Sequence, residues 1–300
     1  MINVPKVQML PNGPSFSKLV QGYWRLAEWD LRPQECLSFI EDHLELGITT
    51  VDHAHVYGSP SCERLFGKAL SLDPSLRDQM EIISKCGIEL PAEGRITHYN
   101  SSKDSIIYSV ELSLSRLGVD HLDALLIHRP DYLMDADVVA EAFQQLKQEG
   151  KVKHFGVSNF NSAQFSLLQS RLDEPLITNQ IEINPLNLDS LHNGILEKLQ
   201  ELRVTPMAWS CLGGGELFND ELEKSQRLIY ELTKIAKELE VDSIDQVIYA
   251  WVMRHPSNPI PILGTGDIDR IKNAVNSLQL TMNHEQWYRI LAASRNHGVV

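Results

Sequence analysis

The sequence of 300 residues predicts an α/β fold of the (β/α)8 TIM-barrel type, and its pattern of apolar residues indicates this class. Short apolar runs alternate with longer stretches of helical periodicity, so strand and helix follow one another along the chain. Several of the short runs are apolar at successive positions, as strands covered on both faces are. With the segment near Ser17–Trp24 counted as the first strand, the chain holds about eight such units, the number in that barrel.

The same pattern assigns the expected elements in order. Strands are expected near Ser17–Trp24 and at Thr49–Asp52, Met80–Lys85, Leu122–His128, His154–Ser158, Ile177–Ile183, Thr205–Trp209 and Ile260–Gly264. Helices are expected at Arg32–Leu46, Ser101–Leu117, Val138–Leu146, Asn161–Leu168, Leu191–Leu202, Ser225–Leu239, Ser243–Met253, Asp267–Leu278 and Asn283–Ala293. The gap between the last two strands holds more helix than one crossover needs, so extra helices are predicted near the C-terminus.

A doubly wound open sheet is the alternative fold for this alternation of elements. Such a sheet carries a glycine fingerprint after its first strand, where it binds a dinucleotide. Neither Gly22-Tyr23-Trp24 nor Gly47-Ile48 fits that fingerprint, so the barrel is preferred. No linker, low-complexity segment or shift in composition divides the chain, and residues 1–300 are therefore predicted to form a single domain.

Composition and charge restrict the classes of partner and compartment. The chain has 27 Lys and Arg against 40 Asp and Glu, a formal net charge of −13, which disfavours nucleic acid or an anionic membrane as a partner. No apolar run approaches the roughly 20 residues of a membrane span. The segment Met1–Gly13 lacks the basic and apolar regions of a secretory leader. A cytoplasmic protein is predicted.

The cysteines indicate neither a disulfide framework nor a metal site. The chain has four of them, Cys36, Cys62, Cys86 and Cys211, and they lie far apart in the sequence. No C-x-x-C pair and no Cys/His spacing typical of zinc occurs. We therefore expect a reducing compartment and no bound metal.

Four titratable side chains fall at or near the expected carboxyl ends of successive strands, where barrel enzymes place their active residues. The second strand ends in Asp52 with Tyr57 just beyond it, the third ends in Lys85 and the fourth in His128. An adjacent ammonium lowers the pKa of a phenol, a carboxylate holds the ammonium in place, and an imidazole can orient a carbonyl. Each residue alone also fits a cap, a packing contact or a solvated charge. Together they predict a proton donor for an oxygen that gains negative charge.

Three motifs of this sequence resemble those of the aldo-keto reductase family. Asp52 to Gly58 reads D-H-A-H-V-Y-G, similar to the family signature D-x-A-x-x-Y-G. His128 to Asp131 reads H-R-P-D and resembles the segment H-x-P-D. Gly150 to Phe160 reads G-K-V-K-H-F-G-V-S-N-F and is similar to G-K-x-x-x-x-G-V-S-N-F. The resemblance covers nearly the whole chain in the right order and is closest to bacterial members with a short C-terminal tail.

The resemblance implies a catalytic role for each of the four strand-end residues. Tyr57 would be the general acid in the reduction of a carbonyl, and Lys85 would depress the pKa of its hydroxyl. Asp52 would pair with Lys85, and His128 would orient the carbonyl of a small aldehyde or ketone. The hydride would come from a reduced nicotinamide cofactor. The family uses a barrel and no metal, in agreement with the missing glycine fingerprint.

The resemblance also maps a cofactor site. Ser158, Asn159 and Gln180 match residues that bind the nicotinamide carboxamide, a group that needs both a donor and an acceptor. Trp209 falls where the family places an aromatic ring, more often tyrosine, that stacks on the nicotinamide. The loop beside the pyrophosphate would be Ser210, Cys211, Leu212, Gly213, Gly214 and Gly215. Its glycines allow backbone N–H groups to approach phosphate closely.

The C-terminal segment resembles the family's adenosine site only in part. Gly264, Thr265 and Arg270 match that site, and Thr265 with Arg270 would hold a 2′-phosphate. Many members have Lys at the position of Gly264, and many have an acidic residue and an Asn where this chain has Asn273 and Ala274. We therefore expect NADPH (NADP+) to be preferred over NADH, chiefly through Arg270, with different adenine contacts.

Fewer features of the sequence indicate which residues contact the substrate. Trp24 ends the first strand and is expected to wall the pocket, with Val56 and Arg129 as further candidates at the rim. The short loop after His128 and the short segment Asn296–Val300 predict an open, unselective pocket. The chain is expected to be a monomer or a weak homo-oligomer.

Two other classes of function remain open. One is a barrel aldolase or lyase in which Lys85 forms a Schiff base, a role that requires a neutral amine. The other is a cofactor-sensing regulatory subunit, since this fold also serves as an auxiliary subunit of ion channels.

Overall fold

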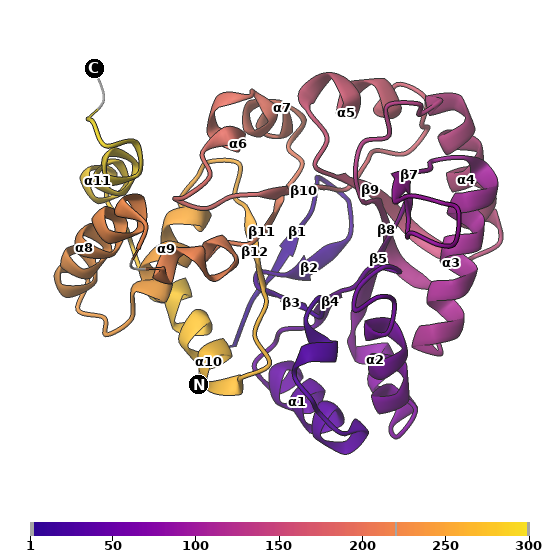
Figure 1. The fold of residues 1–300 in the computed structure, drawn as a ribbon, viewed down its shortest axis with the longest axis horizontal. Coiled ribbons are helices and arrows are strands. Elements are labelled where there is room, and N and C mark those ends of the chain that lie inside the picture. Colours follow the sequence, from indigo (N-terminus) through magenta and orange to yellow (C-terminus); the bar gives the residue numbers. More distant parts are fainter. Residues whose placement is uncertain (1–2, 220, 299–300) are drawn as a thin grey trace.

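A closed barrel of parallel strands forms the centre of the computed structural model, which describes residues 3–219 and 221–298 (Figure 1). The strands follow one another around the barrel as β3 (Val20–Gly22), β4 (Thr50–Asp52), β5 (Glu81–Cys86), β8 (Leu122–Ile127), β9 (Val152–Ser158), β10 (Asn179–Glu182), β11 (Met207–Trp209) and β12 (Ile260–Leu263). Ile262 on β12 pairs with Val20 on β3 and closes the sheet. The predicted (β/α)8 fold is confirmed. Parts of the segments Met1–Gly13 and Asn296–Val300, on which the leader and tail expectations rest, lie outside the described residues.

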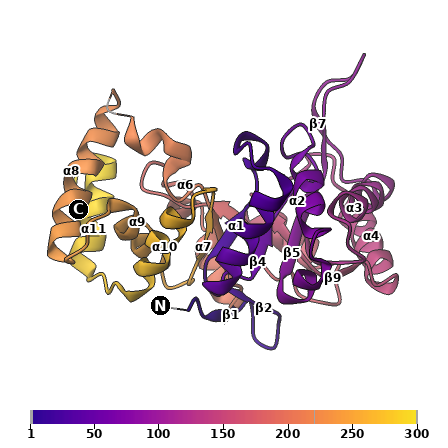
Figure 2. The ribbon, with the colours of Figure 1, turned by 90° about the horizontal axis from the view of Figure 1, so that it is seen from below.

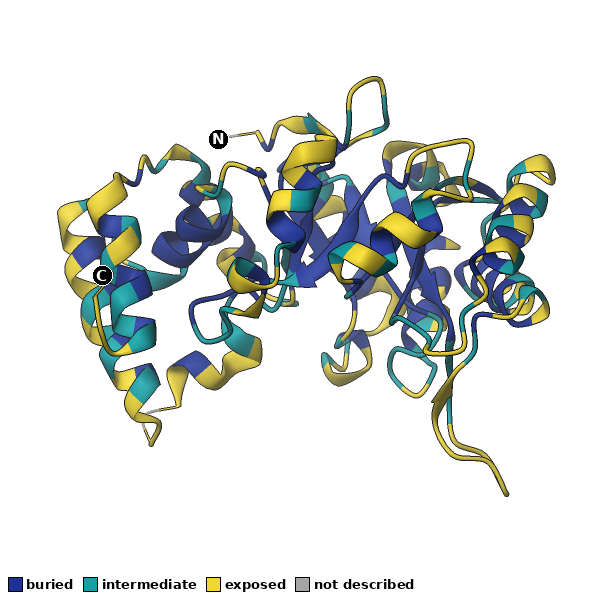
Figure 3. Ribbon diagram, turned by 90° about the horizontal axis from the view of Figure 1, so that it is seen from above, coloured by how far each residue is buried: buried dark blue, intermediate teal, exposed yellow. Residues whose placement is uncertain are grey.

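Helices surround the barrel, with their buried faces against the strands and their exposed faces outward (Figure 3). The α-helices of the described residues, of which α8 and α11 pack on other helices outside this ring, are α1 (Pro33–Glu45), α2 (Cys62–Leu70), α3 (Lys103–Leu117), α4 (Ala136–Gln148), α5 (Ser162–Gln169), α6 (Asp189–His192), α7 (Ile195–Leu202), α8 (Glu223–Glu238), α9 (Ile244–Met253), α10 (Ile268–Asn276) and α11 (His284–Arg295). The expected helix Leu191–Leu202 is interrupted, because Gly194 adopts a left-handed φ of 76° between α6 and α7.

The sequence pattern did not predict helix α2. It has nine residues, and its buried side chains include Cys62, Phe66 and Leu70. Gly67 allows this helix to approach the end of α3, because a Cβ there would lie 2.1 Å from the carbonyl oxygen of Arg116. Short helices give a weak periodic signal, so this element was found only in the folded chain.

An antiparallel hairpin of β1 (Lys6–Gln8) and β2 (Ser15–Ser17) precedes the barrel. Its Met9 and Phe16 are buried in one cluster with Val20, Ile83 and Leu126 of the barrel strands, so the hairpin fills one end of the barrel (Figure 1). The expected first strand at Ser17–Trp24 therefore starts later, at Val20.

A second hairpin, β6 (Ile88–Glu89) and β7 (His98–Tyr99), projects away from the barrel (Figure 2). Its tip is exposed over residues 91–99, which Figure 3 shows as a long exposed arm. The sequence pattern did not predict this hairpin, because its paired segments are only two residues long.

The extra helices predicted near the C-terminus are present. Helices α8 and α11 lie side by side outside the ring of helices (Figure 1), where Arg289 donates to the carboxylates of Glu231 and Glu238. Trp287 of α11 stacks on Trp251 of α9 with ring centroids 5.1 Å apart. Among the described residues, no helix is long and apolar enough to cross a membrane.

Candidate active site

The carboxyl ends of β4, β5 and β8 bring the four predicted catalytic side chains together. Asp52 is the last residue of β4, and Tyr57 lies in the turn between β4 and α2. Lys85 is the last residue but one of β5, since Cys86 still pairs with Ile127. His128 directly follows β8, which ends one residue earlier than expected. Because parallel strands end at the same edge of the barrel, these side chains share one face.

Lys85 links two of these residues through its ammonium group. Its Nζ donates to Asp52 Oδ2 at 2.7 Å, to the carbonyl oxygen of His53 at 2.8 Å and to the Tyr57 hydroxyl at 2.9 Å. The Lys85 side chain has no exposed surface and that of Asp52 is 4% exposed. All three donors of the ammonium are thereby used, so the position of the Tyr57 hydroxyl is fixed relative to the barrel.

Burial and the neighbouring charges shift the pKa values of Lys85 and Tyr57 in opposite directions. Burial alone lowers the pKa of Lys85, but the Asp52 carboxylate and Tyr57 outweigh it and raise the pKa above its ordinary value. Burial raises the pKa of Tyr57, although the Lys85 charge opposes the rise. Lys85 therefore lowers the Tyr57 pKa, as expected, but the net shift is upward because the loss of water around the phenol exceeds the effect of the cation. The phenol is protonated at neutral pH.

His128 lies beside Tyr57, with ring centroids 5.6 Å apart and an angle of 81° between the planes. Burial, together with the charges of Lys85 and Arg129, lowers the pKa of His128 well below its ordinary value. Its Nδ1 is buried without a partner among the described residues. The ring is therefore neutral near pH 7, and a neutral imidazole can donate a hydrogen bond from one nitrogen.

The residues predicted to bind a carboxamide lie beside this group. Gln180 donates through Nε2 to Asp52 Oδ1 at 2.8 Å, and no hydrogen bond to its Oε1 occurs within the described chain. The hydroxyl of Ser158 donates to the Gln180 carbonyl at 2.8 Å. Asn159, which has a left-handed φ of 62°, donates to the His128 carbonyl at 3.1 Å. These contacts connect the amide side chains to the catalytic group.

Trp209 ends β11 at the same face of the barrel. Its indole Nε1 donates to Asn159 Oδ1 at 3.1 Å, which orients the ring. The guanidinium of Arg129 lies over the ring, with Cζ 5.5 Å from its centroid. The indole is half-buried and lines a pocket, so an aromatic surface is presented there.

One pocket of about 830 Å3 contains nearly all the predicted site residues. Its lining includes Asp52, Tyr57 and His128 and, from the remaining predictions, Trp24, Ser158, Asn159, Gln180, Trp209, Ser210, Cys211, Leu212, Gly214, Gly264, Thr265 and Arg270. Lys85 lies beneath the lining. Cys211 donates weakly to the Ala208 carbonyl, and burial raises the pKa of its thiol to about 12. The pocket extends from the catalytic group to the predicted adenosine site.

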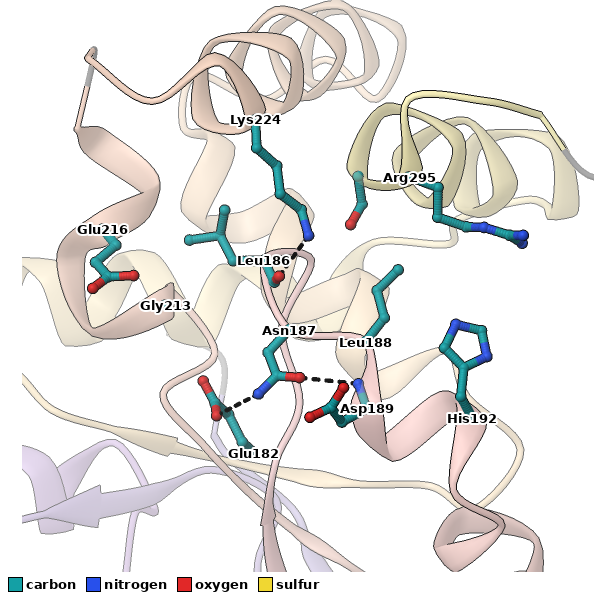
Figure 4. Close-up of a pocket in the computed structure, with 11 residues that line it drawn as sticks. Glu182, Leu186, Asn187, Leu188, Asp189, His192, Gly213, Glu216, Lys224 and Arg295 are labelled. Carbon is teal, nitrogen blue, oxygen red and sulfur yellow. Dashed lines mark hydrogen bonds between the residues drawn. The ribbon is translucent and has the colours of Figure 1, made fainter.

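Gly213 does not line this pocket. It faces a second cavity of about 560 Å3, between the segment after β10 and helices α6, α8 and α11 (Figure 4). Polar groups of that cavity bond within the protein, since Lys224 donates to the Leu186 carbonyl and Asn187 to Glu182 (Figure 4). The glycine run itself adopts left-handed φ angles of 63°, 65° and 105° at Gly213, Gly214 and Gly215, which explains its composition.

The adenosine end of the pocket differs from what the family resemblance implies. Asn273 is bonded to Ser243 and Gln246 of the neighbouring segment, and Ala274 is buried, so neither lines the pocket. Asp245 of α9 lines it instead, together with Arg270. Burial raises the pKa of Asp245, while the charge of Arg270 opposes the rise. A carboxylate thus lies at the end predicted to hold a phosphate.

Sequence reasoning missed several residues that line the main pocket. They are Arg25, Ile88, Leu90, Phe218, Asp245 and Tyr249. Arg25 donates to the Gly214 carbonyl at 3.0 Å and so connects the first strand to the glycine loop. Ile88 begins the short strand β6, Asp245 and Tyr249 lie on α9, Phe218 ends a 3-10 helix, and Arg25 and Leu90 lie in loops. None of them follows a motif, and only the proximity of Arg25 to Trp24 could have indicated its place. Among described residues, no group of His, Cys, Asp and Glu is arranged to hold a metal.

The parallel barrel, with a tyrosine bound to a buried lysine–aspartate pair at its strand ends, defines a class of barrel oxidoreductases. The sequence profile described as "Aldo/keto reductase family" matches residues 18–295. The chain belongs to this family, whose members are oxidoreductases that use nicotinamide cofactors and act on small carbonyl compounds.

Relatives and solved structures agree with this assignment. Oxidoreductase YdhF of Escherichia coli (strain K12) is 55% identical over 99% of both chains. A 6-dehydroglucose reductase of Agrobacterium fabrum is 44% identical over 91% of this chain and 93% of its own. The crystal structure of an aldo/keto reductase from Brucella melitensis is 27% identical and covers 97% of this chain and all of its own, with a TM-score of 0.72. The thermostable aldo-keto reductase Tm1743, at 23% identity, shares the fold with a TM-score of 0.81 over 96% and 99% of the two chains.

Proposed function

We propose that this protein reduces aldehydes or ketones to alcohols with NADPH and that Tyr57 is the general acid. The observation that carries the proposal is the hydrogen-bonded series from Asp52 through the Lys85 ammonium to the Tyr57 hydroxyl. That series ends in a pocket large enough for a small carbonyl compound beside a dinucleotide.

The residues divide the reaction between them. A reduced nicotinamide, when bound, supplies the hydride to the carbonyl carbon. Tyr57 donates its hydroxyl proton to the carbonyl oxygen, and the Lys85 ammonium stabilises the phenolate that results. His128, neutral and adjacent, donates a hydrogen bond that orients the carbonyl. Asp52 and Gln180 hold Lys85 in place and keep it charged.

The residues of the pocket suit a dinucleotide. Gln180 and Asn159 offer amide groups to a carboxamide, and Trp209 offers a ring to a nicotinamide. Arg270 and Thr265 would hold a 2′-phosphate, with the N-terminus of α10 favouring an anion. Asp245 in the same end of the pocket opposes the phosphate charge, so we expect NADPH to be preferred over NADH by a modest factor.

Replacing Tyr57 tests the proposed reaction directly. Tyr57→Phe removes the proton donor and little volume, so kcat should fall by about 10²–10⁴ while NADPH still binds. The measurement is NADPH oxidation with a panel of aldehydes, ketones and sugars. Sugar aldehydes belong in the panel because one relative bears the name 6-dehydroglucose reductase. A near wild-type rate in a folded Tyr57→Phe variant would refute the role of Tyr57.

Neither alternative class gains support from the site. A Schiff-base enzyme needs a neutral, accessible amine, whereas Lys85 is buried, bonded to Asp52 and has a raised pKa. Borohydride should therefore trap no keto substrate on Lys85. No feature of the described surface distinguishes a regulatory subunit, and purification as part of a stable complex would favour that class.

A further inference from the structure

Arg129 introduces a positive charge beside the proposed catalytic group. It follows His128 directly at the end of β8 and lines the same pocket as Tyr57. Its charge lowers the pKa of both Tyr57 and His128, although burial has the larger effect on each of these groups. Its Cζ lies over the face of Trp209, 5.5 Å from the ring centroid.

The guanidinium of Arg129 has no hydrogen bond and no ion pair with any residue that the structure describes. The nearest acidic residue in sequence, Asp131, is engaged elsewhere, since it accepts from the backbone and hydroxyl of Ser101 and from the backbone of Leu133. A half-buried guanidinium with five unused donors is an incomplete anion site.

The other charged groups of the pocket already have partners. Arg25 donates to the Gly214 carbonyl, and Arg270 lies 3.8 Å from the carboxylate of Asp267. Asp52 accepts from Lys85, so it does not neutralise Arg129. Asp245 faces Arg270 at the adenosine end. The charge of Arg129 is therefore left for a ligand of the catalytic end of the pocket.

We propose that Arg129 binds a carboxylate of the substrate and that the preferred substrates are aldehydes or ketones that carry such a group. The inference rests on the proposed reductase function and names its substrate class. A planar guanidinium matches a carboxylate in a bidentate geometry. In a protein of net charge −13, an anionic substrate needs such a local cation. Hydride adds to the carbonyl carbon, the Tyr57 proton goes to the oxygen, and the carboxylate is unchanged.

The test compares oxo acids with their methyl esters, which have nearly the same shape without the charge. We would measure kcat/KM with NADPH for glyoxylate, 4-oxobutanoate and 5-oxopentanoate and for the three esters. For at least one chain length, kcat/KM for the acid should exceed that for its ester by about tenfold to a hundredfold, as expected for a charge-assisted contact. In Arg129→Met this ratio should fall to about one, because any effect of the variant on Tyr57, His128 or Trp209 acts on acid and ester alike and cancels in the ratio.

Two further variants separate the contact from other effects. Arg129→Lys keeps the charge without the planar fork and should retain part of the ratio. Arg95→Met removes the same unit of charge from the exposed tip of the β6–β7 hairpin and should leave the ratio unchanged. An unchanged ratio in Arg129→Met, or a wild-type enzyme that treats acids and esters alike, would overturn the proposal. Preference for uncharged sugar aldehydes over oxo acids would do the same.

Binding distinguishes failure of this inference from failure of the proposed reaction. Calorimetric titration of 4-oxobutanoate into wild type and Arg129→Met, each with NADP+, needs no turnover. Binding that is lost in Arg129→Met supports the carboxylate site even if no carbonyl compound is reduced. Reduction of the neutral esters, with no Arg129-dependent binding of any oxo acid, supports the reductase function and refutes the site.

Discussion

The imidazole of His53 shows how far the fold tolerates an unsatisfied polar group beside the catalytic residues. Both ring nitrogens are buried without a hydrogen-bond partner among the described residues. The ring stacks on Tyr23, with centroids 5.0 Å apart and planes within 8°, and its backbone carbonyl accepts from Lys85. Burial, with help from the Lys85 charge, lowers the pKa of His53 to about 3. The side chain therefore packs as a neutral aromatic ring.

Its titration predicts an acid-dependent loss of stability. The unfolded chain binds a proton at His53 below about pH 6.5, whereas the folded protein does so only near pH 3. The free energy of unfolding therefore falls as the pH drops from about 6.5 toward 3, by about 2 kcal/mol at pH 5 from this residue. In His53→Phe, which keeps the stack, the difference between pH 7 and pH 5 should shrink by that amount in urea titrations. The same pH difference as in wild type would refute the assignment.

At the scale of elements, the β1–β2 hairpin supports the barrel that carries the site. Phe16 is 1% exposed and packs with the inward side chains of the barrel strands. Phe16→Ala should lower the free energy of unfolding by about 3–5 kcal/mol, because it leaves a cavity in a closed interior. Phe16→Leu retains most of the volume and should cost less. Denaturant unfolding of both variants is the measurement, and a loss under about 1 kcal/mol for Phe16→Ala would show that the hairpin is dispensable.

The sequence predicted the secondary-structure elements whose pattern of apolar residues matches their burial in the barrel. Buried strands were predicted from continuous apolar runs, and β8 ends at Ile127, one residue before the predicted end at His128. The pieces that were missed are short: helix α2 and the hairpins β1–β2 and β6–β7. Such pieces hold their conformation through contacts with the barrel or through cross-strand pairing, so their own sequences carry little periodic signal.

For the molecule as a whole, the negative net charge disfavours NADPH relative to NADH, whereas local contacts such as Arg270 favour NADPH. A net charge of −13 repels the extra phosphate of NADPH at long range, so any preference must come from contacts such as Arg270. Arg270→Met should weaken NADPH about tenfold to a hundredfold and leave NADH nearly unchanged. Asp245→Asn should act in the opposite direction and strengthen NADPH. Tryptophan fluorescence titration with both cofactors is the measurement. Equal losses of affinity for NADPH and NADH in Arg270→Met would contradict the proposal that Arg270 binds the 2′-phosphate.

Some features of the candidate site were predicted from the sequence, and others depend on the tertiary structure. Asp52, Lys85 and His128 were predicted from the sequence because each lies at a strand end, and topology brings the ends of parallel strands to one face. The net upward shift of the Tyr57 pKa was not predicted, because burial of the phenol depends on every element packed around it. Asp245 was missed for a related reason, since a helix residue enters the pocket only through the way that helix packs.

The sequence by itself determined the class of fold, the order of strands and the residue types at their ends, because these follow from local periodicity and chain connectivity. The tertiary structure alone decided which groups lack a partner. Arg129 has no ion pair within the described part of the chain, where Asp131 accepts from Ser101 instead. Asn273 bonds to Ser243 and does not line the pocket. Hydrogen bonding and desolvation depend on neighbours distant in sequence, so the electrostatics of the pocket emerge only when the barrel has closed.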